Sequence, residues 1–217
     1  MLCLKFKMRL FRKRRKSRKD KIQVKKKVNY FHYKEEEPEN SIDYMFKIVL
    51  LGDSKEKPKL GDQFSKVFES DTKLTIGVDF EVKIIEIDDV RVKFQIWDFS
   101  SETRFQSLIP MYVRGASGGF FVYDMDDKGT TESIEQWITL IKNSIHKQVN
   151  FPLIAIGITP ENEEEIQVSI DEGVQMAETY GLDGFLECQI RNRADIDQAF
   201  TKLVQLILKK KIHSLSS

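Results

Sequence analysis

The stretch FKIVLLGDSKEKPKL, residues 46–60, carries the strongest structural signal in this sequence. Its first half is mostly apolar, which predicts a buried strand, and the strand ends at Gly52. A short polar loop follows, and the apolar residues Phe64, Val67 and Phe68 then recur at helical spacing. A strand, a glycine-bearing loop and a helix form the setting of a phosphate-binding loop, whose full pattern is G-x-x-x-x-G-K-[ST]. Because only the first glycine is present, the stretch predicts the architecture of such a loop without its complete chemistry.

The chain has 217 residues, enough for one domain with an ample core and a terminal tail. Its formal net charge of +1 hides an uneven distribution of charge. Residues 1–27 hold 14 Lys and Arg residues against one acidic residue, net +13, so the remainder of the chain is net −12. This division predicts a basic tail attached to an acidic domain.

Two cysteines, Cys3 and Cys188, are too few for a disulfide framework, which favours a reducing compartment. The three histidines have no metal-ligand spacing, so we expect no metal site built on them. No apolar run approaches the roughly 18 residues of a membrane span, and no signal peptide opens the sequence. We therefore expect a cytoplasmic protein, peripheral at the cytoplasmic face of a membrane if its tail binds lipid.

Residues 1–27, the basic tail, have three interpretations. As a solvated arm, the tail would have no specific partner. As a peripheral anchor, its cations would attract anionic lipid while its apolar residues insert at the interface. As a nucleic-acid binder, which we favour less, the same cations would neutralise phosphates. Five apolar residues alternate with other residues at the start of the tail: Leu2, Leu4, Phe6, Met8 and Leu10.

Charge and turn residues also set the expected domain boundaries. Residues 28–44 change from basic to acidic and contain Pro38, as is typical of a linker. We expect one domain at 45–211 and a short tail at 212–217.

Within that domain, expected strands alternate with expected helices. Val90, Val92, Phe94 and Ile96 alternate with polar residues, and a two-residue turn at 88–89 joins them to the segment 81–87. So short a turn predicts an antiparallel hairpin and hence an edge strand. The whole pattern predicts a three-layer α/β fold with a six-stranded, mostly parallel sheet and one antiparallel edge strand. The remaining expected strands are 118–123, 151–157 and 184–188. The remaining expected helices are a short one ending at Val113, one through Ile134–Ile145, one at 168–180 and a last one ending at Lys211.

From residue 46 to about residue 208 the chain resembles the Ras-type small GTPases, especially their Rab-like branch. The matching motifs are FKIVLLGDS, TIGVDF, QIWDFSSETRF, MYVRGASGGFFVYD and ESIEQWI, in family order. The resemblance implies a small G domain of the P-loop NTPase type, GTP or GDP bound with Mg²⁺, and effector proteins bound through the switch surface.

In the family's phosphate-binding loop, backbone amides converge on the phosphates, a lysine reaches the outer ones and a hydroxyl binds Mg²⁺. Three residues of this loop are kept by position: Gly52, Asp53 and Ser54. Lys57 takes the lysine position in a loop that is one residue short, and Pro58 then replaces the hydroxyl, with neither a ligand nor an N–H to offer. The resemblance thus implies weak or absent nucleotide binding, and the three lysines within 55–59 form an alternative cationic site.

The switch motifs are altered as well. By position, Thr75 and Asp98 are the candidate Mg²⁺ ligands if nucleotide binds. Ser101 replaces the glycine whose amide meets the γ-phosphate, and Glu102 replaces the glutamine that orients the attacking water. A carboxylate at Glu102 would face the phosphates, a repulsion of about 4 kcal/mol at an effective dielectric near 20. We therefore assign no catalytic residue.

The base-recognition motifs have changed too. Asn-Lys-x-Asp is replaced by residues 158–161, Ile-Thr-Pro-Glu, in which only Glu161 retains a carboxylate for guanine. Ser-Ala-Lys is replaced by residues 189–191, Gln-Ile-Arg, in which Arg191 stands at the lysine position.

Two functions remain. The first is a pseudo-GTPase, an interaction module that binds effector-like proteins through its switch-equivalent surface and an anionic membrane through its basic tail. The second is a GTP-binding switch with slow hydrolysis. The sequence ends HSLSS without the cysteine of the family's prenyl anchor, so we expect the basic tail to serve as the membrane anchor.

Overall fold

A computed structural model describes residues 42–55, 57, 78–87, 89–99, 103–145 and 151–214. Several sequence predictions lie outside these residues: the basic tail, most of the 28–44 linker, the helix through Phe64, and the candidate residues Thr75, Ser101 and Glu102. None of the helices within the described ranges has the length and apolarity needed to cross a bilayer.

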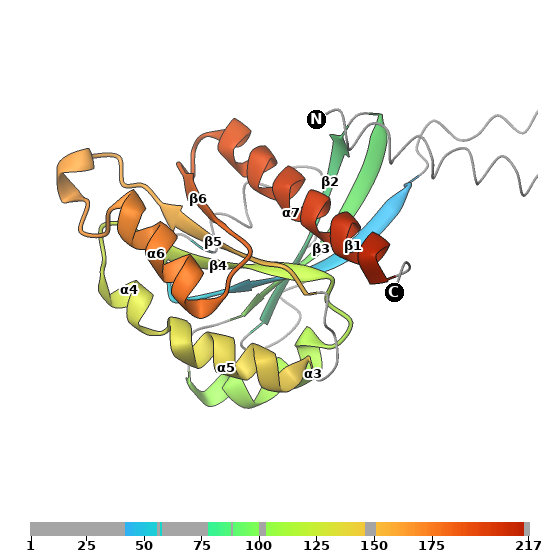
Figure 1. Cartoon of the computed structure of the whole chain (residues 1–217), viewed down its shortest axis with the longest axis horizontal. Helices are drawn as coiled ribbons and strands as arrows, with labels where there is room; N and C mark the ends of the chain where they lie inside the picture. The colour runs from blue at the N-terminus through green and yellow to red at the C-terminus, as the bar shows by residue number, and fades with distance from the viewer. Residues whose placement is uncertain are drawn as a thin grey trace, which may run out of the picture.

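Six strands form one sheet in the order β2-β3-β1-β4-β5-β6 (Figure 1). Every neighbouring pair is parallel except β2 and β3, which are antiparallel and place β2 at the edge. The predicted fold class, including the antiparallel edge strand, is confirmed. The strands are β1 (Tyr44–Leu51), β2 (Val78–Ile87), β3 (Val90–Phe99), β4 (Gly118–Asp124), β5 (Leu153–Ile158) and β6 (Phe185–Cys188).

Described helices cover both faces of the sheet, with α7 on one face and α3 and α5 on the other (Figure 1). Each face has its own hydrophobic core, one against α7 and one against α3, α5 and α6. The helical elements are η1 (Thr103–Leu108), α3 (Ile109–Val113), α4 (Gly129–Glu132), α5 (Ile134–Ser144), η2 (Glu163–Glu165), α6 (Ile170–Tyr180) and α7 (Arg193–Ser214).

Local sequence explains both ends of helix α6, whereas helix α7 extends beyond its predicted end. Ser169 and Glu172 form a capping box that starts α6, and Gly181 ends it in the left-handed conformation at φ 69°. Helix α7 continues to Ser214, so the prediction that it ends at Lys211 was wrong. Lysines near a helix C-terminus stabilise the helix dipole, but they do not stop the helix as glycine or proline does.

Phe200 of α7 illustrates how the first core is packed. Its ring centroid lies 4.9 Å from that of Phe94 on β3 and 5.3 Å from that of Phe120 on β4, both in edge-to-face geometry. In the second core, Trp137 is 2% exposed, in agreement with its prediction as a core residue of the amphipathic helix.

Gly52 ends β1 in a backbone conformation that the fold itself requires. Its φ is 103°, which favours glycine over any other residue. A Cβ atom at this position would lie 2.1 Å from the carbonyl oxygen of Val122 on the neighbouring strand β4. The packing of β1 against β4 therefore explains why this glycine is kept, whether or not phosphate binds.

We expect Gly52→Ala to lower the free energy of unfolding by about 3 kcal/mol or more, because backbone strain and overpacking each cost roughly 1–3 kcal/mol. Gly115→Ala is the matched control, since Gly115 has φ 79° and no atom within 4 Å of the added Cβ. Urea unfolding of both variants should show the larger loss for Gly52→Ala. Equal losses would show that the contact with Val122 is unimportant.

Candidate functional site

The candidate site lies where the parallel strands end at one edge of the sheet. β1, β3, β4, β5 and β6 finish at Leu51, Phe99, Asp124, Ile158 and Cys188. Ligands of open α/β sheets bind at this edge, outside the carboxyl ends of the strands. The polar residues that follow these strand ends are therefore the ones to examine.

Lys57 lies at the centre of this edge, and protein oxygens surround its ammonium group. Its Nζ donates to the carbonyl oxygen of Gly52 at 2.8 Å and to the carbonyl oxygen of Phe99. The same Nζ lies 3.1 Å from Oδ1 of Asp98, in an ion pair whose side chains are 5% and 13% exposed. The Asp98 contact is Coulombic, because that oxygen has no well-aligned hydrogen bond within the described residues. Two donors of the lysine are thus used by backbone carbonyl oxygens, and its charge faces the Asp98 carboxylate.

The ionisation of Asp98 depends on this lysine. Burial raises the pKa of Asp98 above its ordinary value, Lys57 opposes that increase, and the carboxylate of Asp79 adds a smaller one. Among the described residues, Lys57 is the cation that acts on the Asp98 carboxylate, so its removal would leave this buried carboxylate without a counter-charge. Lys57 therefore favours the charged form of Asp98 and opposes the effect of burial on its pKa.

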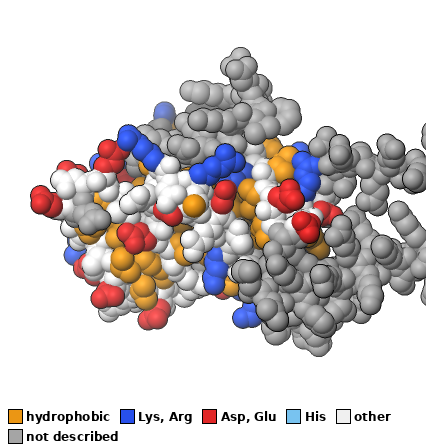
Figure 2. Space-filling view, turned by 90° about the horizontal axis from the view of Figure 1, so that it is seen from above, with side chains coloured by type: hydrophobic (Ala, Val, Ile, Leu, Met, Phe, Trp, Pro, Cys, Tyr) orange, Lys and Arg blue, Asp and Glu red, His pale blue; other side chains and the backbone are white. Residues whose placement is uncertain are grey.

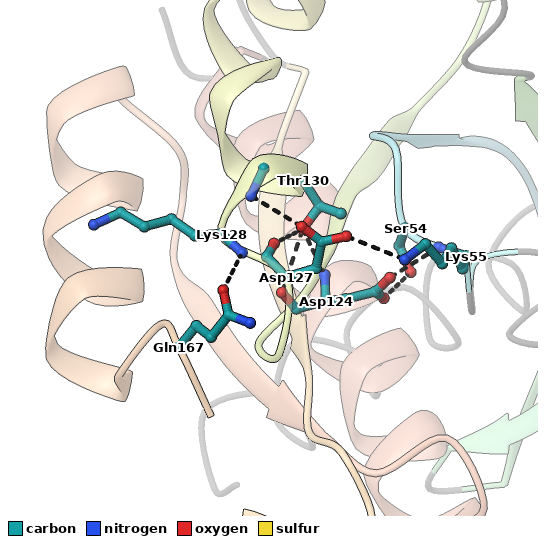
Figure 3. Close-up of polar contacts among 8 residues, drawn as sticks. Ser54, Lys55, Asp124, Asp127, Lys128, Thr130 and Gln167 are labelled. Atoms are coloured by element: carbon teal, nitrogen blue, oxygen red, sulfur yellow. Dashed lines mark hydrogen bonds and ion pairs between the residues drawn. The ribbon is translucent and has the colours of Figure 1, made fainter. Parts of the chain in front are cut away.

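Asp124, at the end of β4, holds the loop that contains Ser54 and Lys55 (Figure 3). The Ser54 hydroxyl donates to its Oδ1, and the backbone N–H of Lys55 donates to its Oδ2 at 2.9 Å. Its own backbone N–H donates to Oγ1 of Thr130 at 3.0 Å. Both carboxylate oxygens are thus directed at the loop, and Asp124 is only 4% exposed.

Sequence reasoning missed Asp124, although a signal was present. An acidic residue closes GGFFVYD, residues 118–124, a strand whose other residues are glycine or apolar. A charged side chain at the end of a fully buried strand needs a polar partner, and the facing loop supplies it.

Further contacts fix the outer part of the loop. Lys55 Nζ pairs with Oδ2 of Asp127 at 3.2 Å, which raises the pKa of this exposed lysine. On the other side, Trp137 Nε1 donates to Oδ1 of Asp53 at 3.1 Å. The loop is therefore attached to the segment after β4 and to helix α5.

The base-recognition positions also contact one another. Thr159 donates through its hydroxyl to Oε1 of Glu187 at 3.1 Å. Arg191 Nη1 lies 2.6 Å from Oε1 of Glu161, and both side chains are more than 70% exposed. The structure thus brings together Glu161 and Arg191, the two candidate residues of this region, as an ion pair.

Among the described residues of the site, several groups expected to hold a guanine nucleotide with Mg²⁺ are bonded within the protein. The Lys57 ammonium, the Ser54 hydroxyl and the Lys55 amide are bound to protein oxygens. Glu161 is paired with Arg191, and Ile158, 3% exposed, offers no polar side-chain group. Of the predicted site residues, Gly52, Asp53, Ser54, Lys57 and Asp98 gather at one end of the edge, and Glu161 and Arg191 gather at the other.

Beside this edge lies a half-buried aromatic cluster that sequence reasoning also missed. It consists of Phe80, Trp97 and Tyr112, with centroid distances of 5.2 Å between the first two and 5.4 Å between the last two. Lys47 Nζ lies 4.4 Å from the Trp97 ring centroid, a cation–π contact. Met111, the residue before Tyr112 on α3, is 62% exposed. A partly exposed aromatic group of this kind is typical of protein-binding surfaces.

Comparison with known proteins completes the assignment. A sequence model of the Ras family matches residues 47–209. The GTP-binding protein ypt2 of Schizosaccharomyces pombe is 36% identical over 174 residues, which cover 79% of this chain and 86% of that protein. Rab-3 of Caenorhabditis elegans is 32% identical over 185 residues (82% and 81%), and human Rab-15 is 35% identical over 169 residues (77% and 78%). Fold, motifs and these matches together establish that the protein belongs to the Ras family, within the Ras/Rab superfamily of small GTPases.

Proposed function

We propose that this protein is a pseudo-GTPase, a Ras/Rab-like interaction module that works at a membrane surface without a nucleotide cycle. One observation carries the proposal: Gly52, Phe99 and Asp98 hold the ammonium of Lys57. In a working phosphate site, the lysine neutralises phosphate oxygens. Here the same charge neutralises a carboxylate of the protein.

Nucleotide would have to compete with these internal contacts. Phosphate can recruit Lys57 only by removing the counter-charge of Asp98, so binding requires another cation at that carboxylate. The Lys55 amide would also have to leave Asp124. Pro58 and Glu102 add to the cost, because they replace the Mg²⁺ hydroxyl and the water-orienting glutamine of the family. Weak or absent binding follows from these combined losses.

A protein partner at the switch-equivalent surface is part of the proposal. The aromatic cluster of Phe80, Trp97 and Tyr112 lies on β2, β3 and α3. Phe80 and Trp97 fall between Thr75 and Glu102 in the sequence, and Tyr112 follows Glu102. Aromatic side chains supply much of the binding energy of protein interfaces. We infer that effector-like proteins bind here in a manner that does not depend on nucleotide.

Membrane attachment through the basic tail is the second part. Its net charge of +13 favours an anionic surface, at about 1 kcal/mol for each cation near the lipid. Its apolar residues add a contribution that salt does not screen. We place the protein at the cytoplasmic face of a membrane, with nucleic acid as the less favoured partner of the same tail.

The second candidate function is a GTP-binding switch with slow hydrolysis. It is favoured by Gly52, Asp53, Ser54 and Asp98, which keep their family positions, and by the similarity to a protein named for GTP binding. Mg²⁺ arriving with a nucleotide would replace Lys57 as the counter-charge of Asp98 and free the lysine for phosphate. The two functions therefore differ in a single measurable affinity.

We expect titration calorimetry with GDP and a non-hydrolysable GTP analogue in millimolar Mg²⁺ to give micromolar or weaker binding. Each lost hydrogen bond to a charged group is worth roughly 1.5–3 kcal/mol, so three losses move a nanomolar site into this range. Phosphate release over hours should be negligible. Submicromolar binding that disappears in Asp98→Ala would establish the switch instead. A binding signal that this variant leaves unchanged would come from nucleotide bound at another site.

We expect Lys57→Met to lower the free energy of unfolding by about 3 kcal/mol, because it leaves a buried carboxylate without its cation. The deficit should shrink as pH falls: loss of Lys57 raises the pKa of Asp98 further, and protonation then removes the buried charge. Asp98→Asn in the same chain should restore most of the loss in urea unfolding.

Lys55→Met is the matched control for this experiment. It removes a cation from the same loop, but one whose side chain is 78% exposed, so we expect no measurable change in stability. If Lys57→Met were equally harmless, the ion pair with Asp98 would not organise the site.

We expect deletion of residues 1–27 to abolish co-sedimentation with anionic vesicles. Replacing Leu2, Leu4, Phe6 and Leu10 by serine should leave binding that vanishes at high salt, because only the electrostatic part is screened. Vesicle binding that persists after the deletion would rule out the tail as the anchor. A salt-dependent shift of nucleic acid without any vesicle binding would assign the tail to that partner.

A further inference from the structure

Hydrophobic side chains reach the surface in separate patches on the side of the molecule that Figure 2 shows. Five large hydrophobic residues are the most exposed of those described: Met45, Ile84, Met111, Ile170 and Val174. Two of them, Met45 on β1 and Ile84 on β2, lie on the same face of the sheet. Strand pairing connects them, because both are partners of Lys93 on the intervening strand β3.

These residues belong to a face defined by alternation along the strands. Phe46, Phe94 and Ile85 pack in the core against α7, so the residues between them point to the opposite face. Two cross-strand rows result, Met45–Lys93–Ile84 and Lys47–Gln95–Val82. We call these six residues the outer sheet face.

At one end of the outer sheet face, Lys47 Nζ donates to the carbonyl oxygen of Arg114, the residue that ends α3, at 3.2 Å. None of the six residues belongs to either hydrophobic core, although the next row, Val49–Trp97–Phe80, joins the second core and the aromatic cluster. Met45 is 56% exposed and Ile84 is 41% exposed. The face is therefore continuous with the aromatic cluster and accessible within the described part of the molecule.

The chemistry of the outer sheet face indicates what would bind there. Lys93 lies between two exposed apolar side chains, and Lys47 lies in the adjacent row. None of the six residues is acidic, and the next row on the same side of the strands holds Glu86 opposite Arg91. Partial burial lowers the pKa of Lys47, so a nearby anion would stabilise its charged form. A segment that combines carboxylates with aromatic side chains is complementary to this pattern.

The chain itself supplies such a segment immediately before β1. Residues 28–41, VNYFHYKEEEPENS, contain four glutamates and one lysine, net −3, together with three aromatic residues, Tyr30, Phe31 and Tyr33. The segment ends four residues before Met45, and its 14 residues can extend up to about 45 Å. Covalent attachment at so short a distance gives an effective concentration in the millimolar range.

We propose that residues 28–41 dock on the outer sheet face of their own chain and limit access of other proteins to it. The glutamates pair with Lys93 and Lys47, and the aromatic residues cover Met45, Ile84 and the edge of the aromatic cluster. This inference rests on the proposed function, because the proposed function assigns partner binding to the aromatic cluster. Binding of the basic tail to a membrane would pull on the docked segment and expose the face.

Methionine oxidation in the full-length protein tests the docking directly. Hydrogen peroxide is applied, and mass spectrometry gives the rate at Met45 relative to that at Met111, which lies on α3 outside the six residues. Charge reversal of the segment by Glu35→Lys, Glu36→Lys and Glu37→Lys should raise the Met45-to-Met111 rate ratio. We expect about a threefold increase, which follows if the effective concentration of the segment is millimolar and its dissociation constant for the face is submillimolar.

Two lysine variants serve as a matched pair. Lys93→Glu should raise the same ratio by a similar factor, and combining it with the segment reversal should bring the ratio back toward that of the wild type. Lys142→Glu changes the net charge equally but lies on α5, so it should leave the ratio unchanged.

Three results would overturn the proposal. A ratio that is the same in the wild type and in the segment reversal would show that residues 28–41 do not cover Met45. Protection that disappears on dilution would assign the face to a second copy of the chain. Protection that appears only with anionic vesicles would assign it to lipid. The basic assay contains neither nucleotide nor vesicles. Its failure would therefore not bear on the pseudo-GTPase proposal, which the calorimetric titration tests separately.

Discussion

A buried carboxylate requires a counter-charge, and in this protein Lys57 supplies it to Asp98. The pair joins the loop after β1 to the end of β3, and the carbonyl oxygens of Gly52 and Phe99 complete the surroundings of the ammonium. In the family these positions serve phosphate and Mg²⁺. Here the lysine and the aspartate at these positions form an ion pair with each other. The site edge can therefore be folded and electrostatically balanced without a ligand, which is what a module without a nucleotide cycle needs.

The residues kept from the family motifs have structural reasons to stay. Gly52 is required by the close approach of the Val122 carbonyl, and Asp124 holds the Ser54 hydroxyl and the Lys55 amide. Packing constraints of this kind act whether or not nucleotide binds. The retained glycine in the loop is thus weak support for phosphate binding, whereas the replacement of hydroxyl, glutamine and base-recognition residues bears directly on it.

The two surfaces proposed to bind other groups do not depend on the chemistry of the nucleotide site. The aromatic cluster and the outer sheet face lie side by side on β1, β2 and β3, in consecutive rows of the same ladder. The acidic segment that precedes β1 and the basic tail before it carry opposite charge. This order along the chain, cationic tail, acidic segment and then the sheet, would couple membrane attachment to exposure of the partner surface, in place of a nucleotide-driven change.

The sequence by itself determined the fold class, most element boundaries and the family. Burial on one face of a strand or helix produces a local period in the apolar residues, and the family motifs are contiguous stretches of sequence. The alternation from Val90 to Ile96 and the two-residue turn before it were sufficient to predict the antiparallel edge. Only the tertiary structure decided which polar groups meet at the sheet edge. Ser54 and Asp124 are 70 residues apart in the chain, and the pairing of Glu161 with Arg191 depends on two different strand ends. Such contacts are set by strand order and register, which place distant side chains together without leaving a local pattern.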